Sequence, residues 1–291
     1  MLADGEAFTT LPDQAAGTRV AAFPWISRPP RSMGTRFFRH LRGTRGGAPE
    51  RALAASREFW EAKAHENAYW YVSSFGAYQG RDPAEFWSSG QRLWHDLKTT
   101  LAYAPSRGDT VVEIGCGVGR LTRAIAPEVG HVHAFDLSPQ MLSIAGAYPF
   151  PNVTFHLGDG QSLRPLRDQC ARLVLAYCVF QHLPSEHVLA TYLGEMTRVA
   201  EPAGILAFTL TPRTWRNHLA PLLRVKRWLK ERLLPDGPRG LYRSEWLGIR
   251  PRDQTVRALS PVALSRTLLH GDKWLFYGRT EVAPAETRRT A

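Results

Sequence analysis

Residues 111–119 read VVEIGCGVG. An apolar, strand-forming run carries one carboxylate, Glu113, and then opens into Gly115, Gly117 and Gly119 at every second position. Glycine adopts positive φ without strain and lets a ligand lie directly against the backbone. Open α/β sheets bind their ligands at the carboxyl ends of the strands. The stretch therefore predicts a buried strand that ends in a ligand-binding loop.

The spacing of the glycines narrows the kind of ligand. A dinucleotide-binding turn has the pattern GxGxxG, with a third glycine that lets the helix pack against the strand. Here that position holds Arg120. No Gly-Lys-Ser/Thr follows the loop, as a P-loop would require. The spacing disfavours nicotinamide and flavin dinucleotides and excludes a P-loop nucleotide.

Composition predicts a soluble, globular, cytoplasmic protein. The 291 residues are 44% hydrophobic, enough for a large core without disulfides or metal. Cys116, Cys170 and Cys178 form no CxxC pair, which favours reduced thiols and disfavours structural zinc. His131 and His133 share one strand face but lack a third ligand, so we expect no metal.

Charge and hydropathy limit the partners. The formal charge of +11 suggests nucleic acid, but 32 of the 37 basic residues are Arg, a bias that the base composition of the source genome can also produce. The charge alone therefore disfavours a nucleic-acid partner without excluding one. No run approaches the roughly 20 apolar residues of a membrane span, and acidic residues stand where a secretory signal would begin. The sequence indicates no oligomeric state.

The chain divides into four parts by composition and hydrophobic pattern. Residues 1–50 are rich in Pro, Gly and Arg without periodicity, which predicts a mobile basic arm. Residues 51–105 carry aromatic amphipathic patterns and predict a helical cap, with Asp82 capping a helix that has Pro83 in its first turn. Residues 106–281 form the main domain, with a helical lid or substrate insertion at 212–250. Residues 282–291 are a tail.

Within the main domain, short apolar runs alternate with helical patterns, as in a parallel sheet built from βαβ units. Six strands are expected, the sixth in the run GDKWLFYGR. The clearest helix is SEHVLATYLGEMTRVA, whose apolar residues form one stripe. A basic amphipathic helix is expected at APLLRVKRWLKERLLP, and a short helix from about Asp253. The first five strands are expected near 110–114, 131–135, 152–157, 172–178 and 203–210.

Three acids follow the first three strands. Glu113 suits an ammonium ligand, or it accepts backbone N–H bonds from the turn. Asp136 comes 17 residues after Gly119, where an acid can accept both hydroxyls of a ribose. Ser138 is placed to cap the next helix. Asp159 can accept from an exocyclic adenine amine, or its Asp-Gly pair only makes a turn.

The glycine loop, the acids and the fourth-strand segment LVLAYCVFQHLP together resemble the class I S-adenosylmethionine-dependent methyltransferase family, in its small-molecule branch. The resemblance covers about 105–211 and, more weakly, the last strand. It implies a Rossmann-like, doubly wound sheet of seven strands, mostly parallel with an antiparallel last strand. It also implies S-adenosylmethionine as cofactor, with Glu113 near its methionine portion, Asp136 at the ribose and Asp159 at the adenine. The other cofactor contacts implied are Gly115, Cys116, Gly117, Leu137, Met141, Gly160 and Cys178.

Methyl transfer from a sulfonium requires alignment above all, and some acceptors also require a base. His182 follows the fourth strand and is our candidate, because imidazole titrates near neutrality; alternatively it only shapes the pocket. Candidate substrate residues are the aromatic Trp70, Tyr71 and Tyr78, and Gln181.

Three functions fit these features. The first is methyl transfer to O, N or C of a small molecule, expected to be a specialised metabolite. The second is RNA or protein methylation through the basic arm and the insertion, although Cys178 to Gln181 lack the Asn/Asp-Pro-Pro-aromatic tetrapeptide of aminomethylating relatives. The third is a cofactor-binding scaffold without transfer.

Overall fold

The computed structural model describes residues 49–73, 82–210, 248–270 and 273–281. The predicted arm lies outside these ranges except for its last two residues, Pro49 and Glu50. Tyr78, nearly all of the 212–250 insertion with its basic helix, and the tail also lie outside them.

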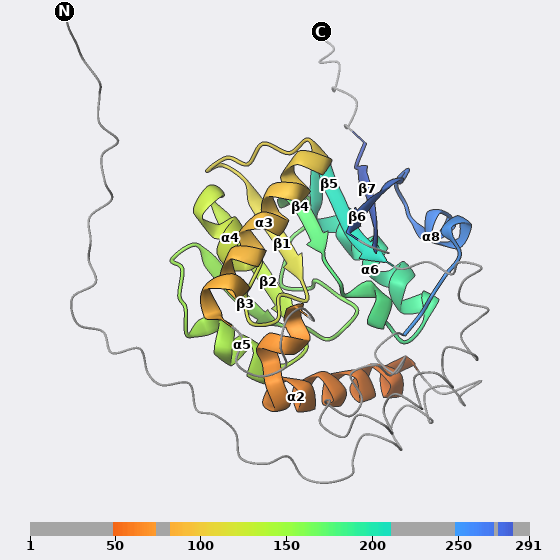
Figure 1. The fold of residues 1–291 in the computed structure, drawn as a ribbon. Coiled ribbons are helices and arrows are strands. Elements are labelled where there is room, and N and C mark those ends of the chain that lie inside the picture. Colours follow the sequence, from red (N-terminus) through yellow and green to blue (C-terminus); the bar gives the residue numbers. More distant parts are fainter. Residues whose placement is uncertain (1–48, 74–81, 211–247, 271–272, 282–291) are drawn as a thin grey trace, which may run out of the picture. The chain divides into compact units, whose positions relative to one another are not determined.

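Seven strands form one sheet in the order β3-β2-β1-β4-β5-β7-β6 (Figure 1). Strands β1 to β5 pair in parallel, and β7 pairs antiparallel with both β5 and β6. The strands are β1 (Thr110–Ile114), β2 (His131–Asp136), β3 (Val153–Leu157), β4 (Ala171–Ala176), β5 (Ala200–Leu210), β6 (Ser265–His270) and β7 (Lys273–Arg279). The expected fold class is confirmed.

Three strand assignments made from the sequence were wrong, one of them the start of β5, which begins at Ala200 instead of near residue 203. Strand β4 ends at Ala176, two residues before the expected end, because Cys178 has a φ of +60° and leaves the ladder. The run VALSRTLL was not recognised as a strand, yet all of β6 except its last residue, His270, lies within it. This edge strand leaves Leu268 about half exposed (53%), so its sequence lacks the continuous apolar run of the central strands.

Helices cover both faces of the sheet (Figure 1). Alternate residues of β1 point to opposite faces, so that Val111 joins a core with α3 and α4 while Val112 joins another with α6 and α8. The helices are α2 (Pro49–Ser73), α3 (Pro83–Leu101), α4 (Thr122–Ile125), α5 (Pro139–Gly146), α6 (Glu186–Val199) and α8 (Asp253–Leu259), with 3₁₀ turns η1 (Ala126–Glu128) and η2 (Phe180–His182).

The capping predictions are confirmed. The side chain of Asp82 accepts from Ala84 N at 2.9 Å, and Pro83 begins α3. Ser138 Oγ accepts from Met141 N at 3.0 Å at the start of α5. Helix α2 is interrupted at Asn67, whose φ and ψ are −169° and 79°. The short segment 68–73 therefore runs in a different direction from the rest of α2.

Candidate active site

The glycine loop turns back against the end of β2. Gly115 N and Cys116 N both donate to Phe135 O, at 2.7 and 2.9 Å, so two loop amides hold the turn in place. Gly115, Gly117 and Gly119 have φ of +73°, +55° and +80°, a region in which side chains are strained. The side chain of Cys116 points into the core, and burial raises the pKa of its thiol. Only its backbone can face a ligand.

Glu113 lies beneath this loop and is 3% exposed. Its Oε2 accepts from Thr122 Oγ1 at 2.5 Å, so the partner observed is a hydroxyl of α4 rather than a backbone N–H. Burial raises the pKa of Glu113 to about 7, although the hydrogen bond from Thr122 and the charge of Arg120 favour its ionised form. A cation placed beside a buried acid of this kind stabilises the ionised carboxylate.

Asp136 ends β2, as the sequence predicted, and joins β2 to the glycine loop. Its Oδ2 accepts from Gly117 N at 2.8 Å and its Oδ1 from Ser138 N at 2.9 Å. A carboxylate has about four acceptor positions, so each oxygen keeps one for a ligand hydroxyl. Burial raises the pKa of Asp136, and the neighbouring backbone amides, those of Ser138 and Gly117 foremost, oppose the rise.

Asp159 follows β3 and is exposed. It accepts from Gln161 N at 2.9 Å and from Ser162 N and Oγ, both at 2.7 Å, so it makes the turn that was the alternative to a ligand role. Burial alone would raise its pKa, but the hydrogen bonds from Ser162 and Gln161, together with the charge of Arg164, outweigh this and lower it. Gly160 has a φ of +91° and lies beside Leu137 and Leu53.

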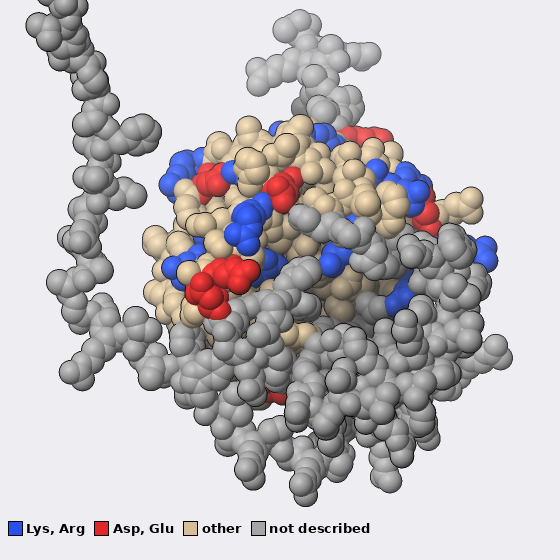
Figure 2. Space-filling model, viewed as in Figure 1, with Lys and Arg blue, Asp and Glu red and all other residues tan. Residues whose placement is uncertain are grey.

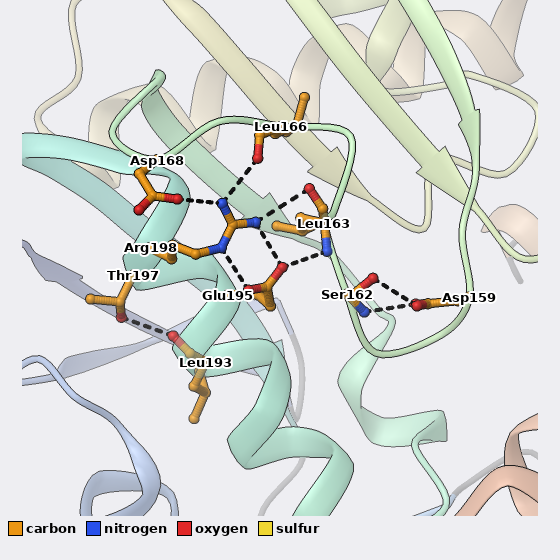
Figure 3. A network of polar contacts seen from close by, with 9 residues as sticks. All are labelled: Asp159, Ser162, Leu163, Leu166, Asp168, Leu193, Glu195, Thr197 and Arg198. Atoms are coloured by element: carbon orange, nitrogen blue, oxygen red, sulfur yellow. Dashed lines mark hydrogen bonds and ion pairs between the residues drawn. The ribbon is translucent and has the colours of Figure 1, made fainter.

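The loop after Asp159 is fastened to α6 by one arginine (Figure 3). Arg198 pairs with both oxygens of Glu195, at 2.7 and 2.8 Å, and with Asp168 at 2.7 Å. It also donates to Leu166 O at 2.9 Å, and Glu195 accepts from Leu163 N at 2.8 Å. These bonds fix the course of the loop that carries Asp159.

Helix α2 lies across the carboxyl ends of the strands, beyond the arrowheads of β1 and β4 in Figure 1. Arg57 donates to Gly158 O at 3.2 Å, and Glu61 accepts from Ser138 Oγ at 2.6 Å. Farther along, Ala64 packs with Met141, and Val72 lies against Gly117. The two segments of α2 together thus cover the edge from the end of β3 to the glycine loop.

His182 lies in η2 at the same edge. Its ring meets Trp60 of α2 edge-on, with centroids 4.9 Å apart, and its Nε2 lies 3.3 Å from Gln181 Nε2. Gly248 N donates to Gln181 O at 2.6 Å, so the chain returns from the insertion beside His182. Just before η2, Cys178 N donates to Thr209 Oγ1 at 2.6 Å, and burial raises the pKa of the Cys178 thiol.

The candidate substrate residues are less closely grouped. Trp70 and Tyr71 are buried and pack edge-on with centroids 5.0 Å apart, and Tyr71 OH donates to Glu66 Oε1 at 2.9 Å. Gln181 adjoins His182, and its Oε1 is buried without a hydrogen-bond partner. The substrate roles of these residues stay predictions.

Sequence reasoning missed the site residues that α2 contributes. Trp60 and Glu61 were placed in an amphipathic helix but not at the site. Their spacing of three and four residues from Arg57 and Ala64 shows that they share one helical face. It does not show what that face covers.

The described ranges offer neither a metal cluster nor a membrane-spanning helix. Within the described ranges, no group of three or more His, Cys, Asp or Glu is arranged to hold a metal ion. None of the helices in those ranges has the length and hydropathy needed to cross a bilayer. On the face drawn in Figure 2, basic side chains alternate with acidic ones across the part of the surface that the structure describes.

The strand order, with its antiparallel β7, and the glycine loop at the end of β1 define a Rossmann-like fold of the methyltransferase type. Residues 112–208 match the family model of a methyltransferase domain. The solved DhpI–SAH complex has the same fold, with a TM-score of 0.51 and 18% identity over 82% of this chain and 99% of that one. Residues 112–208 are therefore similar to a methyltransferase domain, and the chain has the Rossmann-like fold of such domains.

Two curated relatives match shorter stretches. A ribosomal RNA small subunit methyltransferase A from Thiobacillus denitrificans is 41% identical over 59 residues, 20% of this chain and 23% of that protein. A malonyl-[acyl-carrier protein] O-methyltransferase from Pectobacterium atrosepticum is 33% identical over 122 residues, 42% of this chain and 44% of that protein. The chain thus spans less than half the length of either relative.

Proposed function

We propose that this chain binds S-adenosylmethionine along the carboxyl edge of its sheet and transfers the methyl group to a small-molecule acceptor. The observation that carries the proposal is the convergence of Glu113, Asp136 and the glycine loop at one edge, with one acceptor position left on each oxygen of Asp136. The adenine side is assigned to the loop of Asp159 and Gly160. The methionine side is assigned to Glu113.

The glycine positions fit a ligand that approaches the backbone closely. A Cβ added at Gly115 would lie 2.2 Å from Val179 Cγ2, and one added at Gly117 would lie 2.5 Å from Val72 Cγ2. The atoms nearest the loop are therefore ends of side chains. Binding then requires Val72 and Val179 to withdraw, and the interruption at Asn67 supplies a hinge for the segment that carries Val72.

The bound cofactor supplies a methyl group on a sulfonium, a leaving group that needs no further activation. The protein has to align the acceptor and exclude water, and α2 covers the edge where this happens. His182 is proposed to take the acceptor proton at a ring nitrogen. Trp60 packs against that ring and fixes its orientation.

A small-molecule acceptor is favoured by the aromatic residues beside His182 and by relatives such as the malonyl-[acyl-carrier protein] O-methyltransferase. The competing proposal is an RNA acceptor, because one relative is a ribosomal RNA small subunit methyltransferase A. The three free thiols, each with a pKa raised by burial, support a cytoplasmic location.

Calorimetry with S-adenosylmethionine and S-adenosylhomocysteine tests the cofactor, with NAD as the control. Methyl-labelled cofactor incubated separately with a small-metabolite extract, total RNA and protein then tests the acceptor class. Label in the metabolite fraction is the expected result. Binding of NAD instead of both sulfur ligands would overturn the proposal. Label found only in RNA or protein would show that the acceptor is a macromolecule and not a small molecule. Cofactor binding without any methyl transfer would favour a scaffold.

A further inference from the structure

Arg120, directly after the last loop glycine, is a buried cation with little to compensate it. The residue is 8% exposed. Its Nη1 donates to Ser89 Oγ at 3.2 Å, and its Nε is buried without a hydrogen-bond partner. Over the described ranges, no ion pair joins it to a carboxylate. Burying a guanidinium without a direct counter-charge is costly, so this position indicates an anionic partner.

The surroundings hold Arg120 in place. A Cβ added at Gly90 of α3 would lie 2.4 Å from Arg120 O, so the two backbones are in direct contact. The guanidinium interacts electrostatically with Tyr177 and Cys178, after β4, and with Glu113 at the end of β1. It therefore lies near the ends of β1 and β4, close to Glu113, to which the methionine side of the cofactor was assigned.

Its neighbour on α4 provides a contrast. Arg123 is exposed, and its guanidinium stacks on Trp87 and Tyr148, at 4.8 and 5.2 Å from the ring centroids. Cation–π stacking and solvent satisfy that charge. In the described part of the chain, the guanidinium of Arg120 stacks on no aromatic ring, and it is shielded from solvent.

We propose that Arg120 binds the carboxylate of the amino-acid portion of the cofactor, opposite Glu113, which binds the ammonium group. An amino acid carries both charges on one carbon, so its site needs a cation and an anion close together but not paired with each other. Glu113 and Arg120 meet this condition: both are buried, they attract each other, and Glu113 is hydrogen-bonded to Thr122 instead. The inference rests on the proposed cofactor.

The test removes the carboxylate from the ligand and the guanidinium from the protein. Calorimetry measures S-adenosylhomocysteine and its decarboxylated analogue, which keeps the amine, against wild type, Arg120→Met and Arg120→Lys. Arg123→Met, three residues further along in α4, is the matched control. Wild type should prefer the complete ligand by about 10-fold or more, in line with a charge-assisted hydrogen bond. Arg120→Met should remove that preference, Arg120→Lys should keep part of it, and Arg123→Met should keep it all.

Two results would overturn the assignment. Equal weakening of both ligands by Arg120→Met would mean that the residue only supports the loop. An unchanged preference would move the carboxylate contact elsewhere. If Arg120→Met does not fold, a full preference retained in Arg120→Gln, which keeps a polar side chain without the charge, would also refute it. If the wild type binds neither ligand, the proposed function itself is refuted. Failure of the Arg120 assignment can therefore be distinguished from failure of the proposed function.

Discussion

Replacing Asp136 by Asn tests the assignment of the ribose. In the structure each oxygen of this carboxylate accepts one backbone N–H, from Gly117 and from Ser138, and keeps one position for a ligand hydroxyl. An amide keeps one accepting oxygen only. The substitution therefore removes one acceptor for the ligand and leaves one backbone N–H without its partner.

The magnitude follows from these lost bonds. A hydrogen bond to a charged group contributes about 1.5–3 kcal/mol, so Asp136→Asn should weaken S-adenosylhomocysteine binding by about 10- to 150-fold. The unpartnered backbone N–H should lower the free energy of unfolding by about 1–3 kcal/mol. Asp109→Asn is the matched control, because Asp109 also accepts a backbone N–H, from Ser106 at 3.0 Å, but lies before β1 at the opposite end of the strand. It should lose stability without losing affinity.

The assay is a double-mutant cycle by calorimetry, which compares S-adenosylhomocysteine with its 2′-deoxy analogue on wild type and Asp136→Asn. Direct contact predicts a coupling free energy of about 1 kcal/mol or more between the substitution and the hydroxyl. Equal losses for both ligands would show that Asp136 only holds the glycine loop. That result would refute the ribose assignment even if affinity fell.

Three further predictions concern the same edge. His182→Gln should leave cofactor affinity within about 3-fold and lower kcat by about 10²–10⁴, with loss of the acidic limb of the rate profile; near-normal turnover would leave His182 as a pocket-shaping residue. Glu113 has a pKa raised from 4.5 to about 7 in the folded state, so its contribution to stability is complete below about pH 4.5 and is lost as pH rises through 7. Urea unfolding of the wild type should show the free energy of unfolding declining by up to about 3 kcal/mol across this pH range, and Glu113→Gln should remove that decline. The same pH dependence in the variant as in the wild type would contradict the raised pKa. Val72→Ala should increase the association rate of S-adenosylhomocysteine about 3-fold or more in stopped-flow fluorescence, whereas an unchanged rate would mean that Val72 does not obstruct the site.

Several features of the fold could be predicted from sequence because their causes are local. The strand of residues 110–114, the glycine turn and the caps at Asp82 and Ser138 depend on neighbouring residues: an apolar run, positive φ, or a side chain bonded two or three residues ahead. The position of Asp136 followed in the same way, since βα spacing fixes where a second strand ends. These features need no knowledge of distant contacts.

The cover over the site was decided only by the tertiary structure. Periodicity showed that α2 has a buried face, but the contacts of Trp60 with His182 and of Val72 with Gly117 join residues about 120 and 45 positions apart. The apolar pattern of a helix specifies how much surface must be buried, and not against which partner. The turn role of Asp159 and the isolated charge of Arg120 likewise depend on which groups the packed chain brings near them, and which it keeps away.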